Sequence, residues 1–219
     1  MKPIAHAISL IFHPIFVIGY GLLILLSINP YLFSIQDDQS RFLLIFSVVT
    51  LTILFPLFAV FLMRKLDLIK SFTMDDRHDR IGPLITTGVF YLWLFINIKG
   101  NSLIPPAFSF FVLGATIALF MSLMMNSFTK ISLHTVGMGG LLAGVLFIRF
   151  FFSYDRFIID LSNGLLSVNT NLILFIVIIA AGAVGTSRLL LKAHTSMDVY
   201  GGYIIGIFSQ IVAFRIMIG

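Results

Sequence analysis

The run FLLIFSVVTLTILFPLFAVFLM, from Phe42 to Met63, is the clearest indication of the fold class of this chain. It contains no charged side chain and is rich in Leu, Phe, Val and Ile. A helix that crosses the hydrocarbon core of a bilayer needs about 20 mostly apolar residues. Because lipid offers no water to hydrogen-bond open backbone groups, a run of this length and composition predicts a transmembrane helix.

The composition of the whole chain extends this prediction. Of 219 residues, 59% are hydrophobic and only 11% are charged, and the mean hydropathy is +1.08. Soluble domains average about 25% charged residues. The chain therefore lacks the polar surface of a soluble enzyme, a nucleic-acid-binding domain or a disordered segment. We attribute the net charge of +5 to loops between spans, where basic residues orient the protein and meet lipid headgroups. With no Cys, disulfides and thiolate metal sites are excluded.

Seven apolar segments predict an all-α, polytopic membrane helical bundle with six to seven transmembrane helices and a single domain over residues 1–219. The segments run from Ile8 to Ile28, Phe42 to Met63, Pro83 to Ile98, Pro106 to Phe128, Val136 to Phe152, Leu172 to Gly185, and Val199 to Ile218. The third, fifth and sixth are short for a crossing, so they extend into flanking loops or one is re-entrant. We interpret the first as a retained span and expect kinks at Pro14 and Pro56.

Polar residues gather in three segments, Lys70 to Arg80, Lys130 to His134 and Ser187 to Asp198. By the span count they follow the second, fourth and sixth spans. An even number of crossings separates each from the next, so all three are expected on the same side of the membrane. This arrangement is what a composite active site requires.

The third of these segments, SRLLLKAHTSMD, carries the strongest chemical signal. His194 and Asp198 are four residues apart and would share a face of a helix. Asp198 could then bond one imidazole nitrogen and leave the other as a base or nucleophile. Arg188 offers a planar fork to phosphate oxygens. The plainer alternative is a His–Asp pair that caps the last span at the interface.

The other two segments are weaker signals. Ser132 could cap the following helix, whose first backbone N–H groups would be open to an anion. His134 is then a candidate proton donor on the same face. The mixed charges around Lys70 and Arg77 are typical of a solvated loop. Taken with His194 and Arg188, however, they suit phosphoryl transfer through a covalent histidine, with cations neutralising the phosphoryl oxygens and no metal.

At this point the sequence resembles the type 2 phosphatidic acid phosphatase superfamily, whose signature is Lys-x6-Arg-Pro, Pro-Ser-Gly-His and Ser-Arg-x5-His-x3-Asp. The third part is matched in full by Ser187, Arg188, His194 and Asp198. The second is represented by Ser132 and His134, with Ile131 and Leu133 in place of Pro and Gly. The first is represented by Lys70 and Arg77, with His78 where Pro is expected. The resemblance covers residues 70–198, within a motif-bearing core of about residues 64–218.

The resemblance implies a metal-independent phosphatase that hydrolyses a membrane lipid phosphate or diphosphate through a phosphohistidine. It makes His194 the nucleophile, Asp198 its orienting partner and His134 the acid for the leaving oxygen. Phosphate-binding roles go to four residues, with Arg80 as a substitute for Arg77. The four are Lys70, Arg77, Ser132 and Arg188. No cofactor and no nucleic acid are implied, and the identity of the lipid and the choice between hydrolysis and phosphotransfer stay open.

The resemblance also implies a multi-pass protein of the cell membrane with its active site on the extracytoplasmic face. The motif side carries more Lys and Arg than the opposite side, which by itself favours the cytoplasm. That excess nearly disappears when the proposed phosphate ligands are removed from the count. We therefore follow the resemblance for the expected sidedness.

Two other classes of function compete with the phosphatase. Asp75, Asp76 and Asp79 fit the Asp-Asp-x-x-Asp pattern of Mg²⁺-dependent prenyl-diphosphate enzymes, which would make the chain a membrane prenyltransferase. A transporter or a non-catalytic membrane protein is the other alternative. Transporters carry ionisable residues near the bilayer midplane, and these spans are nearly free of them. We interpret His6 and His13, in the first span, as interfacial or helix-packing residues.

Overall fold

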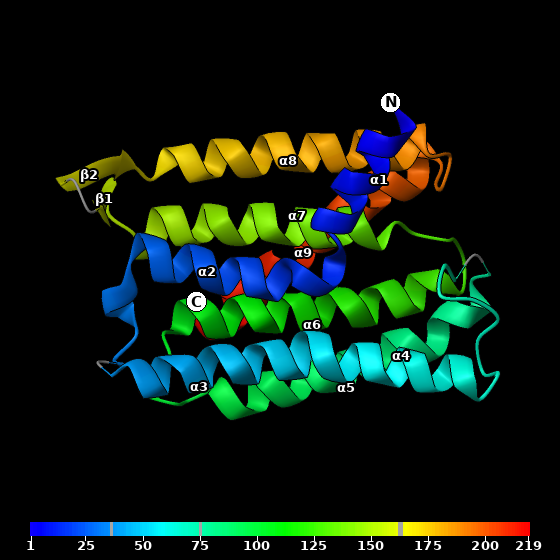
Figure 1. Ribbon diagram of the computed structural model, residues 1–219, viewed down its shortest axis with the longest axis horizontal. Coiled ribbons are helices and arrows are strands. Elements are labelled where there is room, and N and C mark those ends of the chain that lie inside the picture. Colours follow the sequence, from blue (N-terminus) through cyan, green and yellow to red (C-terminus); the bar gives the residue numbers. More distant parts are fainter. Residues whose placement is uncertain (36, 75, 162–163) are drawn as a thin grey trace.

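The computed structural model describes residues 1–35, 37–74, 76–161 and 164–219. Within these residues, seven helices are long and apolar enough to cross a membrane. Most of them run side by side along one common axis, so the protein is an all-α bundle (Figure 1). The predicted fold class and the predicted six to seven spans are confirmed.

The first span is broken into two helices that point in different directions. Helix α1 (Lys2–Ile11) is steeply inclined to α2 (Val17–Ile28) in Figure 1. A residue that precedes proline is pushed out of the helical region, and His13 has φ −64° and ψ 136°. The chain restarts with a 3-10 turn over Pro14–Phe16. The predicted kink at Pro14 is therefore a complete break.

The second span accommodates its proline differently. Helix α3 (Asp38–Val49) continues through a π-helical turn (Thr50–Leu54) into α4 (Phe55–Lys65). A proline has no backbone N–H to continue the helical hydrogen-bond pattern, and a π-helical turn just before it is one way to keep the helix continuous. Pro56 thus alters the helix just before it and does not interrupt the span.

The remaining spans are continuous helices. They are α5 (Ile81–Ile98), α6 (Pro106–Asn126), α7 (Leu133–Phe147) with a π-helical turn (Ile148–Phe152), α8 (Asn171–Leu190) and α9 (Ser196–Met217). A 3-10 turn (His78–Arg80) leads directly into α5. The segments that looked short in the sequence therefore extend into their flanking residues and reach full spanning length.

A β-hairpin joins α7 to α8 and is the feature that an all-helical prediction misses. Strands β1 (Arg156–Leu161) and β2 (Gly164–Asn169) pair antiparallel, with Arg156 opposite Asn169. Figure 1 places this hairpin at the end of the bundle opposite the loop that joins α8 to α9.

Helices α7 and α9 approach each other so closely that their backbones touch. A Cβ atom built on Gly206 would lie 2.1 Å from the carbonyl oxygen of Val136, and one on Gly139 would lie 2.6 Å from that of Tyr203. Only glycine fits at such a crossing, a device common in membrane bundles. The contact holds α7 and α9 together, so it also fixes the relative position of the polar segments at the starts of these helices.

Candidate functional site

The three polar segments meet at one end of the bundle, where the loops after α4, α6 and α8 lie together (Figure 1). Arg80 donates from Nη1 to the carbonyl of Ile131 across 3.1 Å. His194 Nδ1 lies 2.9 Å from the carbonyl oxygen of Lys130. The three segments, separated by even numbers of predicted crossings, therefore lie at the same end of the bundle.

A pocket of about 350 Å³ opens among these loops and continues between the helices. Its polar wall is formed by Arg80, Arg188 and three imidazoles. The imidazoles are those of His13, His134 and His194. Farther in, the walls are apolar and come from five helices, with lining residues such as Val17, Leu57, Leu84, Leu119 and Val136. The pocket reaches Gln210, which at 1.5 Å per residue lies about 20 Å along α9 from its first turn.

His194 is held by a main-chain carbonyl and not by a carboxylate. A carbonyl can only accept a hydrogen bond, so the contact with Lys130 places the imidazole proton on Nδ1. Nε2 then keeps its lone pair. Burial, and after it the charges of Arg188 and Arg80, lower the pKa of His194 from 6.5 to about 4. Near neutral pH, His194 is therefore an uncharged imidazole with one fixed tautomer, the form that a nucleophile needs.

The predicted helical pairing of His194 with Asp198 is wrong. His194 lies in the loop before α9, and Thr195 is the N-cap of that helix. Asp198 accepts bonds from the backbone N–H and the hydroxyl of Thr195, at 2.9 and 2.8 Å, and so completes a capping box. Its other oxygen accepts a 2.6 Å bond from Thr129 Oγ1. Asp198 thus ties the loop that carries His194 to the loop before α7.

Ser132 occupies the N-cap position of α7, but the predicted side-chain cap is wrong. Its carbonyl oxygen accepts from Val136 N, while its backbone N–H donates to the carbonyl of Asp198 across 3.2 Å. Within the described part of the chain, the fully buried Oγ atom has no hydrogen-bond partner. Its phosphate-binding role stays a prediction.

His134 and Arg188 share a partner that belongs to the first span. His134 Nε2 donates to the carbonyl oxygen of Ser9 across 3.0 Å, and Arg188 Nη1 donates to Ser9 Oγ across 3.3 Å. Arg188 lies near enough for its charge to act on the imidazoles of His13, His134 and His194. Among the described residues, its buried Nε atom has no hydrogen-bond partner. A guanidinium so placed can donate to an anion in the pocket.

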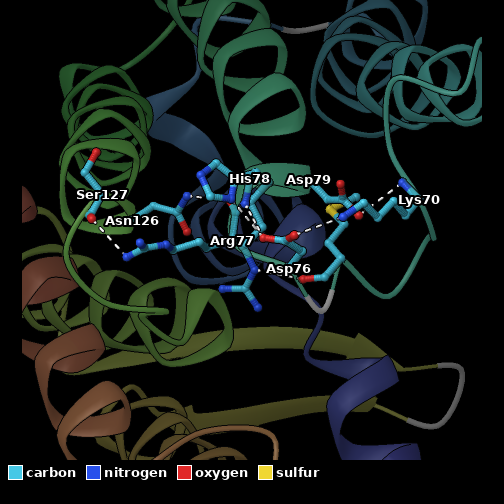
Figure 2. A network of polar contacts seen from close by, with 9 residues as sticks. Lys70, Asp76, Arg77, His78, Asp79, Asn126 and Ser127 are labelled. Atoms are coloured by element: carbon cyan, nitrogen blue, oxygen red, sulfur yellow. Dashed lines mark hydrogen bonds and ion pairs between the residues drawn. The ribbon is translucent and has the colours of Figure 1, made fainter.

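The two basic residues of the first motif, Lys70 and Arg77, bond to different partners (Figure 2). Lys70 has a side chain that is 79% exposed and pairs with Asp76 at 3.2 Å. Arg77 donates from Nη1 to the carbonyl of Ser127 across 3.1 Å. Neither residue lines the pocket, whereas Arg80, which is 8% exposed, does. Of the two arginines weighed from the sequence, Arg80 is therefore the one beside His194.

The acidic residues of the same loop hold its shape. Asp75 lies outside the described residues. Asp76 accepts bonds from the backbone N–H of His78 and from Lys70 Nζ, and these bonds hold the pKa of its carboxyl well below the usual range. Buried Asp79 accepts from the backbone N–H of Lys70 across 3.1 Å. In the described ranges, no three His, Cys, Asp or Glu side chains are grouped to hold a metal ion.

Sequence reasoning missed two residues of the site, Ser9 and His13. Both were assigned to a span without a motif, and His13 was interpreted as an interfacial or packing residue. One signal was present in the sequence: His13 directly precedes Pro14, where a helix must open its backbone. A polar side chain at such an opening is a candidate site residue even when its neighbours are apolar.

Comparisons with models of protein families, with curated proteins and with solved structures return no match. The class that fold and site define is a multi-span helical membrane protein with a pocket of imidazoles and guanidinium groups at one end.

Proposed function

We propose that this chain is a metal-independent membrane lipid phosphatase, of the type 2 phosphatidic acid phosphatase kind, that acts through a phosphohistidine. The observation that carries the proposal is the hydrogen bond between His194 Nδ1 and the carbonyl of Lys130. It leaves Nε2 as an unprotonated nucleophile in a pocket that also holds His134, Arg80 and Arg188. Nucleophile, acid and anion-neutralising groups are thus supplied together.

In the first half-reaction, Nε2 of His194 attacks the phosphorus atom of the lipid phosphate. The P–N bond forms as the P–O bond to the lipid breaks, and the leaving oxygen takes the proton that the phosphate monoanion brought, passed on through Nδ1 of His134. The Nε2–H group of His134 stays on the carbonyl of Ser9 throughout. Arg80 and Arg188 neutralise the phosphoryl oxygens.

In the second half-reaction, water attacks the phosphohistidine. His134, now neutral, removes the proton from that water as the P–N bond breaks, and inorganic phosphate leaves. An acceptor alcohol in place of water would give phosphotransfer by the same route.

The apolar part of the pocket supports a lipid as the substrate. Its walls continue from the imidazoles to Gln210 between helices of a membrane-spanning bundle, so a hydrocarbon chain can stay in an apolar environment while its headgroup meets His194. Following the family resemblance, we place the protein in the cell membrane with this end on the extracytoplasmic face.

The prenyltransferase alternative is less well supported by the geometry. That chemistry needs carboxylates turned toward a shared Mg²⁺. The carboxylates of Asp76 and Asp79 instead accept hydrogen bonds from His78 and Lys70 within their own loop. Neither carboxylate is part of the pocket wall.

The test is phosphate release by purified, detergent-solubilised protein from a panel of lipid monophosphates and diphosphates in excess EDTA. His194→Asn is the inactive comparison, because its amide can still donate to Lys130 but has no nucleophilic nitrogen. His6→Ala, an exposed position on α1, is the matched control. Release by wild type and His6→Ala alone supports the proposal. Activity that appears only with Mg²⁺ overturns it in favour of the acidic loop, and no release from any substrate under either condition overturns it outright.

A further inference from the structure

The break in the first span leaves carbonyl groups at the end of α1 that need hydrogen-bond partners, and one of these partners belongs to the candidate site. The last four carbonyls of a helix have no partner within the helix. In α1, those of Ile8 and Leu10 are taken by the following backbone N–H groups, and that of Ile11 by the hydroxyl of Tyr20. The carbonyl of Ser9 is taken by His134. The end of α1 is thus completed by a side chain of the candidate site.

Ser9 connects the two helices that carry His134 and Arg188. It is buried, and α1 packs against α8 while α2 packs against α7. Through its carbonyl it fixes the imidazole of His134, and through its hydroxyl it meets the guanidinium of Arg188. One residue of the first span therefore sets the spacing between the proposed acid and the proposed anion ligand.

His13 places a third imidazole beside these two groups. Its ring lies edge-on to the ring of His134, with centroids 5.3 Å apart. Its Nδ1 atom accepts from the backbone N–H of Ile15, which is the N-cap contact of the turn after the break. The imidazole proton is therefore on Nε2, and the ring lines the same pocket as Arg188 and His194. A half-buried N–H donor in a pocket that already holds two guanidinium groups suits an anion.

We propose that His13 donates from Nε2–H to an oxygen of the bound phosphoryl group, and that Ser9 is a positioning residue for Arg188 and His134. This inference rests on the proposed function for the identity of the anion. The first span is then a working part of the site. The broken helix supplies both residues, because an unbroken helix would keep the Ser9 carbonyl within its own backbone bonding.

The test measures anion binding without turnover. Inorganic phosphate is titrated into the detergent-solubilised protein in EDTA, and the rise of the melting midpoint gives its dissociation constant. His13→Ala is expected to weaken phosphate binding roughly tenfold or more, the effect of losing one hydrogen bond to a charged group. His13→Gln, whose amide can still donate, should bind phosphate with a dissociation constant within roughly threefold of the wild-type value. His6→Ala should bind phosphate as wild type does.

Equal binding by His13→Ala and wild type would overturn the inference, as would equal losses in the Ala and Gln variants, which would indicate a packing role. A wild-type protein that phosphate does not stabilise would also overturn it. The two proposals fail separately. Phosphate binding that depends on His13 without any lipid turnover ends the phosphatase proposal alone. Lipid turnover with His13→Ala unaffected in binding ends this inference alone.

Ser9→Ala tests the positioning role through the kinetics. It removes the hydroxyl that meets Arg188 but keeps the carbonyl that meets His134. We expect KM for the best lipid phosphate to rise roughly three- to tenfold while kcat stays within about twofold, since a neutral-partner hydrogen bond contributes modestly. Ser9→Thr, which keeps a hydroxyl, should restore KM. A fall in kcat with unchanged KM, or failure of Ser9→Thr to restore a raised KM, would overturn the positioning role.

Discussion

Thr129 and Asp198 are joined by a 2.6 Å hydrogen bond between a hydroxyl and a carboxylate, and this bond links the loop before α7 to the first turn of α9. Thr129 directly precedes Lys130, whose carbonyl fixes the proton of His194. Asp198 therefore influences His194 through the position of a neighbouring carbonyl. Instead of a direct carboxylate–imidazole bond, Asp198 is connected to His194 through Thr129 and the carbonyl of Lys130.

Replacing Thr129 tests this connection, because the residue belongs to no motif. Thr129→Val keeps the shape but removes the donor to Asp198, which frees the Lys130 carbonyl to shift. We expect kcat/KM for the best lipid phosphate to fall about 10- to 100-fold, because small displacements of reacting groups are costly. Thr129→Ser should recover most of the activity. Unchanged kinetics in the valine variant, with the protein folded, would show that the bond is irrelevant to catalysis.

The pKa of His194 offers a prediction that does not need the substrate. Because burial and then the nearby Arg188 and Arg80 charges lower the pKa of His194 to about 4, the ring should stay neutral from pH 7 down to about pH 5 and become protonated below that. Nitrogen NMR of histidine-labelled protein can follow this titration, with His194→Asn identifying the signal. A midpoint at or above the ordinary 6.5 would contradict the described environment.

The two cations Lys70 and Arg188, both predicted phosphate ligands, should contribute very unequally. Arg188 lines the pocket, whereas Lys70 is exposed and pairs with Asp76. Exposed ion pairs are weak, so Lys70→Ala should change kcat/KM less than about threefold. Arg188→Ala removes a charged donor from the anion and should cost about 100-fold or more. Steady-state kinetics in EDTA distinguish the two, and a larger loss at Lys70 would restore the motif assignment made from the sequence.

The crossing of α7 and α9 should tolerate no added side-chain atom. Gly206→Ala would place a methyl group on the backbone of Val136, which cannot yield as a side-chain end can. Such overpacking costs about 1–3 kcal/mol and separates the starts of the two helices, so both the melting midpoint and the activity should fall. Gly182→Ala is the control, since a Cβ there meets nothing within 4 Å. A Gly206→Ala protein as stable as Gly182→Ala would argue against the close crossing.

The spans and their shared polar end could be predicted because lipid penalises exposed backbone and charge so strongly. Hydropathy located the seven helices, and counting crossings placed His134 and His194 at the same end. The β-hairpin at the other end left no comparable signal, since it carries apolar and polar residues in a short connection.

The finer geometry of the site depended on where helices start and stop. Thr195 begins α9 one residue after His194, which removes the helical spacing on which the Asp198 pairing relied. A 3-10 turn ahead of α5 brings Arg80 to the pocket and leaves Arg77 on the carbonyl of Ser127. The role of Ser9 arises only from packing of α1 on α8, and no local pattern encodes such a contact.

The stereochemical course at phosphorus distinguishes a phosphohistidine intermediate from direct attack by water. A lipid thiophosphate made chiral with oxygen isotopes would be hydrolysed by the purified protein in isotopically labelled water, in the presence of EDTA. Transfer to His194 and then to water comprises two in-line displacements, each with inversion, so we expect net retention of configuration. Net inversion would show that water attacks the lipid phosphate directly and would contradict the phosphohistidine.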